Sequence, residues 1–267
     1  MYFFLMNKIL IIGKKSFLGS NLKKYLSKNF KVDNYSFEIL IKKNPIFFDK
    51  YSHVINTSIH KLYIKKKYEE KYDLDTKFIK KFKKINFYYI FLNTRKIYFL
   101  KKNITEKSKI RPLDNYAINK FKTETFLKKK IKNRLISLRI SNILGKRIYK
   151  NNRNHHKLFF DNFLKYRKNN KIILVNNDFK DFLSIDQFSL IILRIITFKI
   201  YGIYNVSISE KIYISELISW IDKKFFKRLK FVNEQKDSFT LSNKKLIKKI
   251  KINLTKKQLM NFCKKLV

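Results

Sequence analysis

The chain has 267 residues, of which 45% are hydrophobic and 16% aromatic, so it can bury a sizeable core and is not a disordered protein. Its net charge of +44 comes mostly from lysines spread along the whole sequence, without zinc-finger spacing, an aromatic ribonucleoprotein motif or a separate basic tail. We therefore interpret the charge as solvated surface rather than a nucleic-acid groove, and the single cysteine, Cys263, excludes an internal disulfide and suits a reducing compartment.

The first predicted element is a buried parallel strand at 8–12, followed by a tight turn at Gly13 and a helical pattern that begins at Asn21. Strand, glycine turn and helix form the setting in which a dinucleotide pyrophosphate lies on a helix N-terminus. Gly13 allows the sharp turn and Gly19 allows close packing of helix on strand, whereas Ser16 replaces the middle glycine and would offer its hydroxyl to phosphate. Glycine occurs only four times in the chain, a scarcity typical of an A/T-rich genome, so this pair predicts nucleotide binding.

A second strand is predicted at 30–36, and the residue at its end decides the cofactor. A carboxylate there would bind the ribose 2′-hydroxyl of NAD. Asp33 lies twenty residues after Gly13, but alignment by strand end places Ser36 there instead. Ser36 has no charge to repel a 2′-phosphate, and Lys42–Lys43 follow, so the choice stays open between NAD and NADP, with NADP slightly favoured.

Strands and helices then alternate. The pattern predicts a strand at 51–58, a helix at 73–82, a strand with a polar end at 85–94, a helix from Asn115 and a strand with a turn at 135–145. This order implies parallel pairing with right-handed crossovers, and hence a doubly wound α/β fold.

The pattern changes after this point. We expect a dinucleotide-binding domain over residues 1–145 and a smaller substrate-binding lobe over 146–267, some segments of which return to the first domain. The elements predicted in the lobe are a helix at 159–164, a strand at 171–175 and a helix at 215–226.

No segment is predicted to cross a membrane. The most apolar later stretch, Phe188–Tyr204, is interrupted by Arg194 and Lys199 and falls short of the ~18 uninterrupted apolar residues of a membrane span. The apolar start, Met1–Met6, runs into the first strand without a cleavage site, so it is a poor signal peptide, and Met6 could be the true start. These features predict a cytoplasmic protein.

No metal site is predicted. Four histidines, His53, His60, His155 and His156, show no metal-ligand spacing with the cysteine. The adjacent pair at 155 and 156 is interpreted as an exposed loop or helix end.

Tyr116 and Lys120 carry the predicted chemistry. On a helix, residues four apart share one face, and a phenol with an ordinary pKa near 10 needs a nearby cation to act as acid or base at neutral pH. The same spacing follows Tyr63 and Tyr98, so context selects Tyr116, which lies after a strand end bearing Thr94 and beside the only alanine. The alternative interpretation is a surface helix that happens to carry tyrosine and lysine.

These pieces, in this order, resemble extended short-chain dehydrogenases/reductases, the group of nucleotide-sugar epimerases, dehydratases and reductases. The resemblance rests on the glycine loop Gly13–Gly19, the segment Asn93–Tyr98, the Tyr116 and Lys120 pair followed by Glu124, and the segments Leu138–Gly145, Lys180–Asp186 and Gly202–Ser207. It implies a Rossmann-like doubly wound parallel sheet with a small C-terminal substrate lobe.

The resemblance also implies site residues. The catalytic residues would be Thr94, Tyr116 and Lys120; the cofactor contacts Gly13, Ser16, Phe17, Leu18, Gly19, Ser36, Asn56 and Lys120; and the substrate contacts Thr94 and Asn142, with no metal. The departures from the family pattern are Ser16, Ser36, Asn93, Lys180 and the aspartate, Asp73 or Asp75, where a helix asparagine is usual.

The implied activity is NAD(P)-dependent reduction or 4-epimerisation of a nucleotide-activated sugar in surface-polysaccharide synthesis, with a homodimer expected by resemblance. Arg95–Lys96 stand where sugar dehydratases usually carry Asp-Glu, which disfavours dehydration. Two alternatives stay open: a catalytically impaired relative that binds nucleotide as a scaffold, and a basic protein that binds nucleic acid through its lysines.

Overall fold

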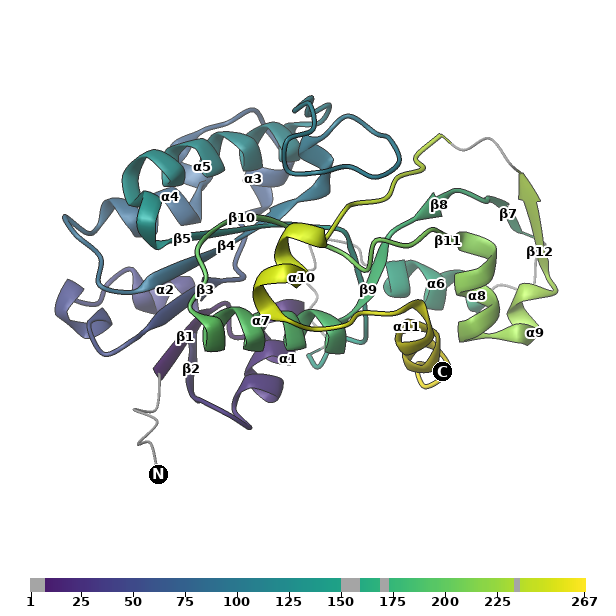
Figure 1. Ribbon diagram of the computed structural model, residues 1–267, viewed down its shortest axis with the longest axis horizontal. Coiled ribbons are helices and arrows are strands. Elements are labelled where there is room, and N and C mark those ends of the chain that lie inside the picture. Colours follow the sequence, from purple (N-terminus) through teal and green to yellow (C-terminus); the bar gives the residue numbers. More distant parts are fainter. Residues whose placement is uncertain (1–7, 150–158, 169–172, 233–235) are drawn as a thin grey trace.

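Six parallel strands form the central sheet of the computed structural model, which describes residues 8–149, 159–168, 173–232 and 236–267 (Figure 1). The strands lie in the order β2, β1, β3, β4, β5, β10. Their bounds are Lys31–Tyr35, Lys8–Ile12, His53–Asn56, Tyr88–Thr94, Leu135–Ile140 and Gly202–Val206. This is the doubly wound parallel sheet predicted from the sequence, and its order reverses between β1 and β3. The predictions for Met1–Met6, His155 and His156, and the first two residues of the strand at 171–175, fall outside the described residues.

The sheet has a hydrophobic core on each face because side chains alternate along its strands. In β1, Ile9 and Ile11 pack into the core shared with α1, α7 and α10, whereas Leu10 and Ile12 pack into the core shared with α2, α4 and α5. All four side chains are fully buried. Figure 1 shows these helices on the two sides of the sheet. The bounds of the helices in the first half are Phe17–Leu26 (α1), Phe37–Leu40 (α2), Lys61–Lys65 (α3), Leu74–Lys80 (α4) and Asn115–Ile131 (α5).

The first helix begins earlier than predicted. The sequence pattern placed its start at Asn21, but α1 begins at Phe17 because Ser16 caps it, accepting a hydrogen bond from the Gly19 N–H at 2.9 Å. The apolar spacing that revealed the helix starts only with Leu22, so the first turn carried no periodic signal.

The chain leaves the central sheet after β5 and returns to it at β10, and segments before and after β10 form three two-stranded sheets outside it. The short strand β6 (Asn142–Leu144) already pairs outside the central sheet, with β9 (Phe182–Ser184). The remaining small strands are β7 (Ile173–Asn176), β8 (Phe179–Lys180), β11 (Ile212–Tyr213) and β12 (Leu229–Val232), and the helices are α6 (Phe159–Arg167), α8 (Ile214–Ile221), α9 (Lys223–Phe226) and α11 (Lys256–Cys263). The helix predicted at 215–226 is thus two helices, divided at Asp222, whose backbone is extended and whose side chain caps α9.

Three later elements return to the central sheet. The apolar stretch at 188–204 is the helix α7 (Ile185–Phe198) followed by β10, with a left-handed turn at Lys199 between them. A capping box of Ser184 and Gln187 starts α7. The helix α10 (Lys244–Ile250) packs beside α7 in the same core.

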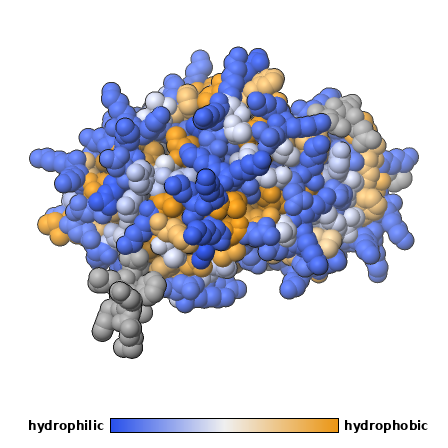
Figure 2. Space-filling view, in the orientation of Figure 1, coloured by the Kyte–Doolittle hydropathy of each residue, from blue (hydrophilic) through white to orange (hydrophobic). Residues whose placement is uncertain are grey.

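Among the described residues, no helix is long and apolar enough to cross a membrane. Nor does that part of the chain bring three histidine, cysteine or acidic side chains together to hold a metal ion. Figure 2 shows hydrophilic side chains spread over the visible face of the molecule rather than gathered in one patch.

Candidate functional site

The glycine loop lies at the carboxyl end of β1, and both of its glycines are required there. Gly13 has φ of 115°, a backbone conformation that side chains disfavour. A Cβ on Gly19 would clash with the carbonyl oxygen of Gly13 and with the Thr57 hydroxyl, so only glycine lets α1 pack this closely against the ends of β1 and β3.

Ser16 fits the loop in a different way from the one predicted. Its hydroxyl caps the Gly19 N–H and lies 2.7 Å from the Thr57 hydroxyl. The expectation that this hydroxyl is offered to a phosphate is therefore wrong, because the group is used inside the loop. Thr57 itself carried no sequence signal of this role, and its hydroxyl donates to the Ile12 carbonyl at 2.7 Å.

The first turn of α1 can hold an anion. The Gly19 N–H donates to the Ser16 hydroxyl. The N–H groups of Phe17 and Leu18 also belong to the first turn of the helix, where N–H groups find no acceptor within the helix itself. The positive end of the helix dipole favours negative charge at this point. The loop also lies where the strand order reverses, so the residues present fit a dinucleotide pyrophosphate.

Ser36 lies beside the glycine loop. The Gly13 N–H donates to the carbonyl of Tyr35, the last residue of β2, at 2.7 Å, and Ser36 follows directly. Asp33 lies two residues before that end, where it forms an ion pair with Lys8 at 2.9 Å. The residue at the edge of the sheet is thus Ser36, as alignment by strand end predicts, and not Asp33, which lies twenty residues after Gly13.

Asn56 ends β3, and its side chain points into the protein. Its amide donates to the Asp75 carboxylate at 2.9 Å, and its carbonyl oxygen accepts from the Ser58 N–H at 2.9 Å. Both polar ends of the side chain are engaged internally. Asn56 therefore holds Asp75 and the turn that carries Thr57 in place.

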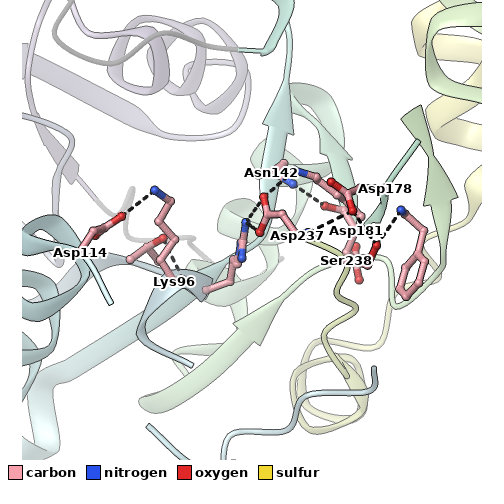
Figure 3. Close-up of polar contacts among 11 residues, drawn as sticks. Lys96, Asp114, Asn142, Asp178, Asp181, Asp237 and Ser238 are labelled. Carbon is pink, nitrogen blue, oxygen red and sulfur yellow. Dashed lines mark hydrogen bonds and ion pairs between the residues drawn. The ribbon is translucent and has the colours of Figure 1, made fainter. Parts of the chain in front are cut away.

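Thr94 is the last residue of β4 and is 9% exposed. Its hydroxyl oxygen accepts from the Lys96 N–H at 3.3 Å, so its own hydrogen remains to be donated to a ligand oxygen. The Lys96 ammonium lies 2.8 Å from the carboxylate of Asp114 (Figure 3). This ion pair ties the segment after β4 to the start of α5.

The helix α5 carries the predicted tyrosine and lysine. Asp114 caps it by accepting from the Ala117 N–H at 2.8 Å, which places Tyr116 in the first turn. Two charged side chains, Lys120 and Glu124, lie on the buried face of the helix, where apolar ones are expected. The other buried residues of the helix are Ala117, Asn119, Thr123, Leu127 and Ile131. Tyr116 itself is half-buried.

Lys120 lies against the sheet. Its ammonium is 4.5 Å from the centre of the Phe91 ring in β4 and 3.9 Å from an oxygen of the Asp75 carboxylate. Burial lowers the pKa of Lys120, and the carboxylates of Asp75 and Asp73 oppose that effect. Burial is likewise the largest effect on Tyr116 and raises its pKa above the ordinary value, and Asp114 and Asp75 raise it further. Within the chain itself, these groups thus raise the pKa of Tyr116 rather than lower it.

Glu124 anchors a buried network behind the site. Its carboxylate accepts from Asn93 at 2.8 Å, from Ser137 at 2.5 Å and from Arg139 at 2.5 and 3.1 Å. Arg139 in turn donates to the Tyr98 hydroxyl at 2.7 Å. The network joins β4, α5 and β5, so it fixes the strand that ends at Thr94 against the helix that carries Tyr116.

A second polar cluster joins the segment after β4 to the short strand β8 (Figure 3). Asp237 forms ion pairs with Arg95 at 3.0 Å and with Lys180 at 2.6 Å. Nearby, the Asn142 amide donates to the carbonyl of Asp181 at 3.3 Å. The sequence pattern gave no sign of Asp237, because its two partners are 142 and 57 residues away along the chain.

No protein-family model and no curated protein sequence matches the chain. Solved structures do resemble it over nearly its whole length. They include dTDP-glucose 4,6-dehydratase from Bacillus anthracis in complex with NAD, with a TM-score of 0.76 and 14% identity over 97% of this chain and 95% of that one. A UDP-N-acetylglucosamine 4-epimerase from Methanobrevibacter ruminantium, in complex with UDP-N-acetylmuramic acid, gives 0.77 and 16% over 97% and 96%. The dTDP-4-dehydrorhamnose reductase from Bacillus anthracis, in complex with NADP, gives 0.74 and 14% over 98% and 99%.

This likeness shows that the chain has the fold of these nucleotide-sugar enzymes. The predicted Rossmann-like fold is confirmed, and the resemblance inferred from the motifs is confirmed at the level of the fold.

Proposed function

We propose that the protein is an NAD(P)-dependent oxidoreductase or epimerase that acts on a nucleotide-activated sugar, in the synthesis of a surface polysaccharide. One observation carries the proposal: Tyr116 and Lys120 lie on a helix whose start is tied by the Lys96–Asp114 ion pair to the segment that follows Thr94. The glycine loop belongs to the same carboxyl edge of the sheet, which is where ligands bind in doubly wound folds.

In this proposal the residues of the chain bind, orient and transfer a proton. The N–H groups of Phe17 and Leu18 hold the pyrophosphate, and Ser36 faces the adenosine ribose. Lys120 holds the nicotinamide ribose. The nicotinamide supplies or accepts the hydride when it is bound.

The proton transfer belongs to Tyr116 and Thr94. Thr94 donates a hydrogen bond to the reacting sugar oxygen, because its own oxygen already accepts from the Lys96 N–H. Tyr116 gives a proton to that oxygen or removes one from it. A positioned acid or base of this kind contributes roughly 10²–10⁴-fold to a rate.

The residues after Thr94 favour reduction or epimerisation over dehydration. Arg95 is paired with Asp237, and Lys96 is paired with Asp114. Both side chains are cations where a dehydratase of this fold would need acidic groups, which argues against elimination of water.

A scaffold that binds nucleotide without turnover is the second candidate. It is favoured by the raised pKa of Tyr116 and by the position of Asp75 beside Lys120, which offsets the cation expected to activate the tyrosine. Under this alternative the protein binds NAD(P) but converts no sugar.

The test is to mix the purified protein with NADH or NADPH and a panel of 4-keto sugar nucleotides while following the absorbance of the reduced cofactor. Product sugars are separated as well, since an epimerase shows no net change in the cofactor. Consumption of cofactor or a new sugar epimer supports the enzyme. Cofactor binding with neither change supports the scaffold instead.

A further inference from the structure

Asp237 joins the turn after β4 to the small sheets outside the central one (Figure 3). Its carboxylate accepts two hydrogen bonds from one nitrogen of the Arg95 guanidinium, at 3.0 and 3.2 Å, and pairs with the Lys180 ammonium of β8 at 2.6 Å. The Asp237 N–H donates to the Asp178 carboxylate at 3.0 Å. Residues at and beside β8 therefore set the position of the carboxylate that Arg95 meets.

Arg95 is buried, and Asp237 is the one hydrogen-bond and ion-pair partner of its side chain in the part of the chain that the structure describes. The Arg95 side chain is 8% exposed, and its guanidinium carbon lies 3.8 Å from the centre of the Phe239 ring. A buried cation that loses its partner has to regain water, which requires its side chain to move toward the surface. The Asp237 carboxylate therefore decides where the Arg95 side chain lies.

The main chain of Arg95 belongs to the turn that orients the Thr94 hydroxyl. Arg95 directly follows Thr94 and begins the short 3-10 helix Arg95–Ile97. In this turn the Lys96 N–H donates to the Thr94 hydroxyl oxygen at 3.3 Å, which limits the directions left for the hydroxyl hydrogen. Movement of the Arg95 side chain toward water would shift the Lys96 N–H, and with it the Thr94 hydroxyl.

We propose that Asp237 is a positioning residue that acts through Arg95 to hold the Thr94 hydroxyl toward the reacting sugar oxygen. This inference rests on the function proposed above, in which Thr94 donates a hydrogen bond to that oxygen. Asp237 takes no part in the proton or hydride transfer. A displaced donor still lets the sugar bind but stabilises the transition state less, so the loss falls on turnover rather than on binding.

The first test needs neither cofactor nor sugar. Threonine with an NMR-active carbon isotope in its methyl group is incorporated into the protein, and the Thr94 resonance is assigned by its loss in Thr94→Ser. Asp237→Asn should shift this resonance. The matched control is Lys180→Met, which removes the other ion pair of the same carboxylate, leaves Arg95 paired and should leave the Thr94 resonance in place. An unmoved resonance in Asp237→Asn, or equal shifts in the two variants, overturns the proposal.

The second test separates turnover from binding. With a nucleotide sugar that wild type converts, Asp237→Asn should lower kcat roughly 10–100-fold and leave KM and the affinity for NADPH near their wild-type values. Asp237→Glu keeps the charge and should restore part of kcat. Glu216→Gln breaks an ion pair of similar exposure, with Lys256, and should keep the wild-type kcat. A raised KM with unchanged kcat in Asp237→Asn contradicts the proposal.

A double variant distinguishes positioning from the cost of an unpaired buried charge. Arg95→Met combined with Asp237→Asn leaves no buried cation at this point, so its melting temperature should return toward that of wild type. Its kcat should stay as low as in Asp237→Asn, because the contact that holds the turn is still missing. Recovery of kcat together with the melting temperature overturns the proposal.

The same double variant carries both tests if Asp237→Asn alone does not fold, and an unmoved Thr94 resonance or a wild-type kcat then overturns the proposal. If wild type converts no sugar although the Thr94 resonance moves in Asp237→Asn and not in Lys180→Met, the proposed function fails. The link from Asp237 through Arg95 to Thr94 is supported in that case.

Discussion

The Ser16 hydroxyl lies 2.7 Å from the Thr57 hydroxyl, which joins the loop after β1 to the loop after β3. These two strands are neighbours at the point where the strand order reverses. Ser16 also caps α1, so one side chain fixes both the helix and the adjacent strand end. The loop thus tolerates serine in place of a glycine because its hydroxyl bonds Thr57 and the Gly19 N–H, so that the N–H groups of Phe17 and Leu18 are left without a partner in their own helix.

Gly19→Ala should abolish cofactor binding. The added methyl group would clash with the Gly13 carbonyl and the hydroxyls of Thr57 and Ser16, so α1 must move away from the loop. Overpacking of this kind costs about 1–3 kcal/mol. Fluorescence titration with NADPH measures the affinity. Gly202→Ala is the control: it disturbs a glycine with φ of 116° at the start of β10, away from the loop, and should leave the affinity unchanged.

Ser36→Asp should change the choice of cofactor. Ser36 follows the strand end to which the Gly13 N–H is bonded, so a carboxylate there would repel a 2′-phosphate and accept from a 2′-hydroxyl. We expect NADP to bind at least tenfold more weakly relative to NAD, equivalent to about 1.4 kcal/mol. Affinities from parallel titrations of wild type and variant decide the question. An unchanged ratio would mean that Ser36 does not face the ribose.

The sequence was sufficient to predict the features that depend on neighbouring residues. Buried strands such as β1 appear as apolar runs, and scarce glycines mark the turn that follows. The carboxyl ends of parallel strands meet at one edge of a sheet, so the sequence alone predicts that Thr94 and the loop at Gly13 lie on the same edge. Helix starts were less predictable, because the cap at Ser16 precedes the apolar spacing.

Contacts between distant segments could not be predicted in this way. Asp75 and Lys120 are 45 residues apart, and nothing in either local pattern shows that their side chains meet. Arg95 is buried against Asp237 and the Phe239 ring, which lie more than 140 residues away along the chain. Such pairs depend on how helices and loops pack, which a single sequence does not encode in its periodicity.

Glu124→Gln should destabilise the fold strongly. The change leaves Arg139 buried without its charged partner, and breaking a buried ion pair on one side costs about 3–5 kcal/mol. Urea unfolding measures the decrease in the free energy of unfolding. The control is Glu70→Gln, which breaks an exposed pair with Lys80 worth about 0–1 kcal/mol. Equal losses in the two variants would show that the buried network does not stabilise the protein.

Stability should depend on pH through Asp181. Burial raises the pKa of this carboxyl to about 8, although backbone N–H groups from Ile208, Leu241 and Ser209 oppose the shift. Its pKa in the unfolded chain is about 4. The folded protein therefore holds a proton that the unfolded chain releases, so this contribution is complete below about pH 4 and is lost as the pH rises through about 8.

Asp181→Asn removes that titration, and its melting temperature should fall less between about pH 5 and about pH 9 than that of wild type. Asp186→Asn, at an exposed position in the first turn of α7, is the control and should follow the wild-type slope. If the melting temperatures of wild type and Asp181→Asn changed equally with pH, the Asp181 carboxyl of the folded protein would not titrate in this pH range.

The central claim is that Tyr116 transfers the proton, and turnover of Tyr116→Phe tests it most directly. The variant is compared with Tyr201→Phe, which removes the hydroxyl of an exposed tyrosine just before β10. With reduced cofactor and a 4-keto sugar nucleotide that wild type converts, Tyr116→Phe should bind NADPH normally and turn over roughly 10²–10⁴-fold more slowly. Tyr201→Phe should keep its turnover. Wild-type turnover in Tyr116→Phe would contradict the account.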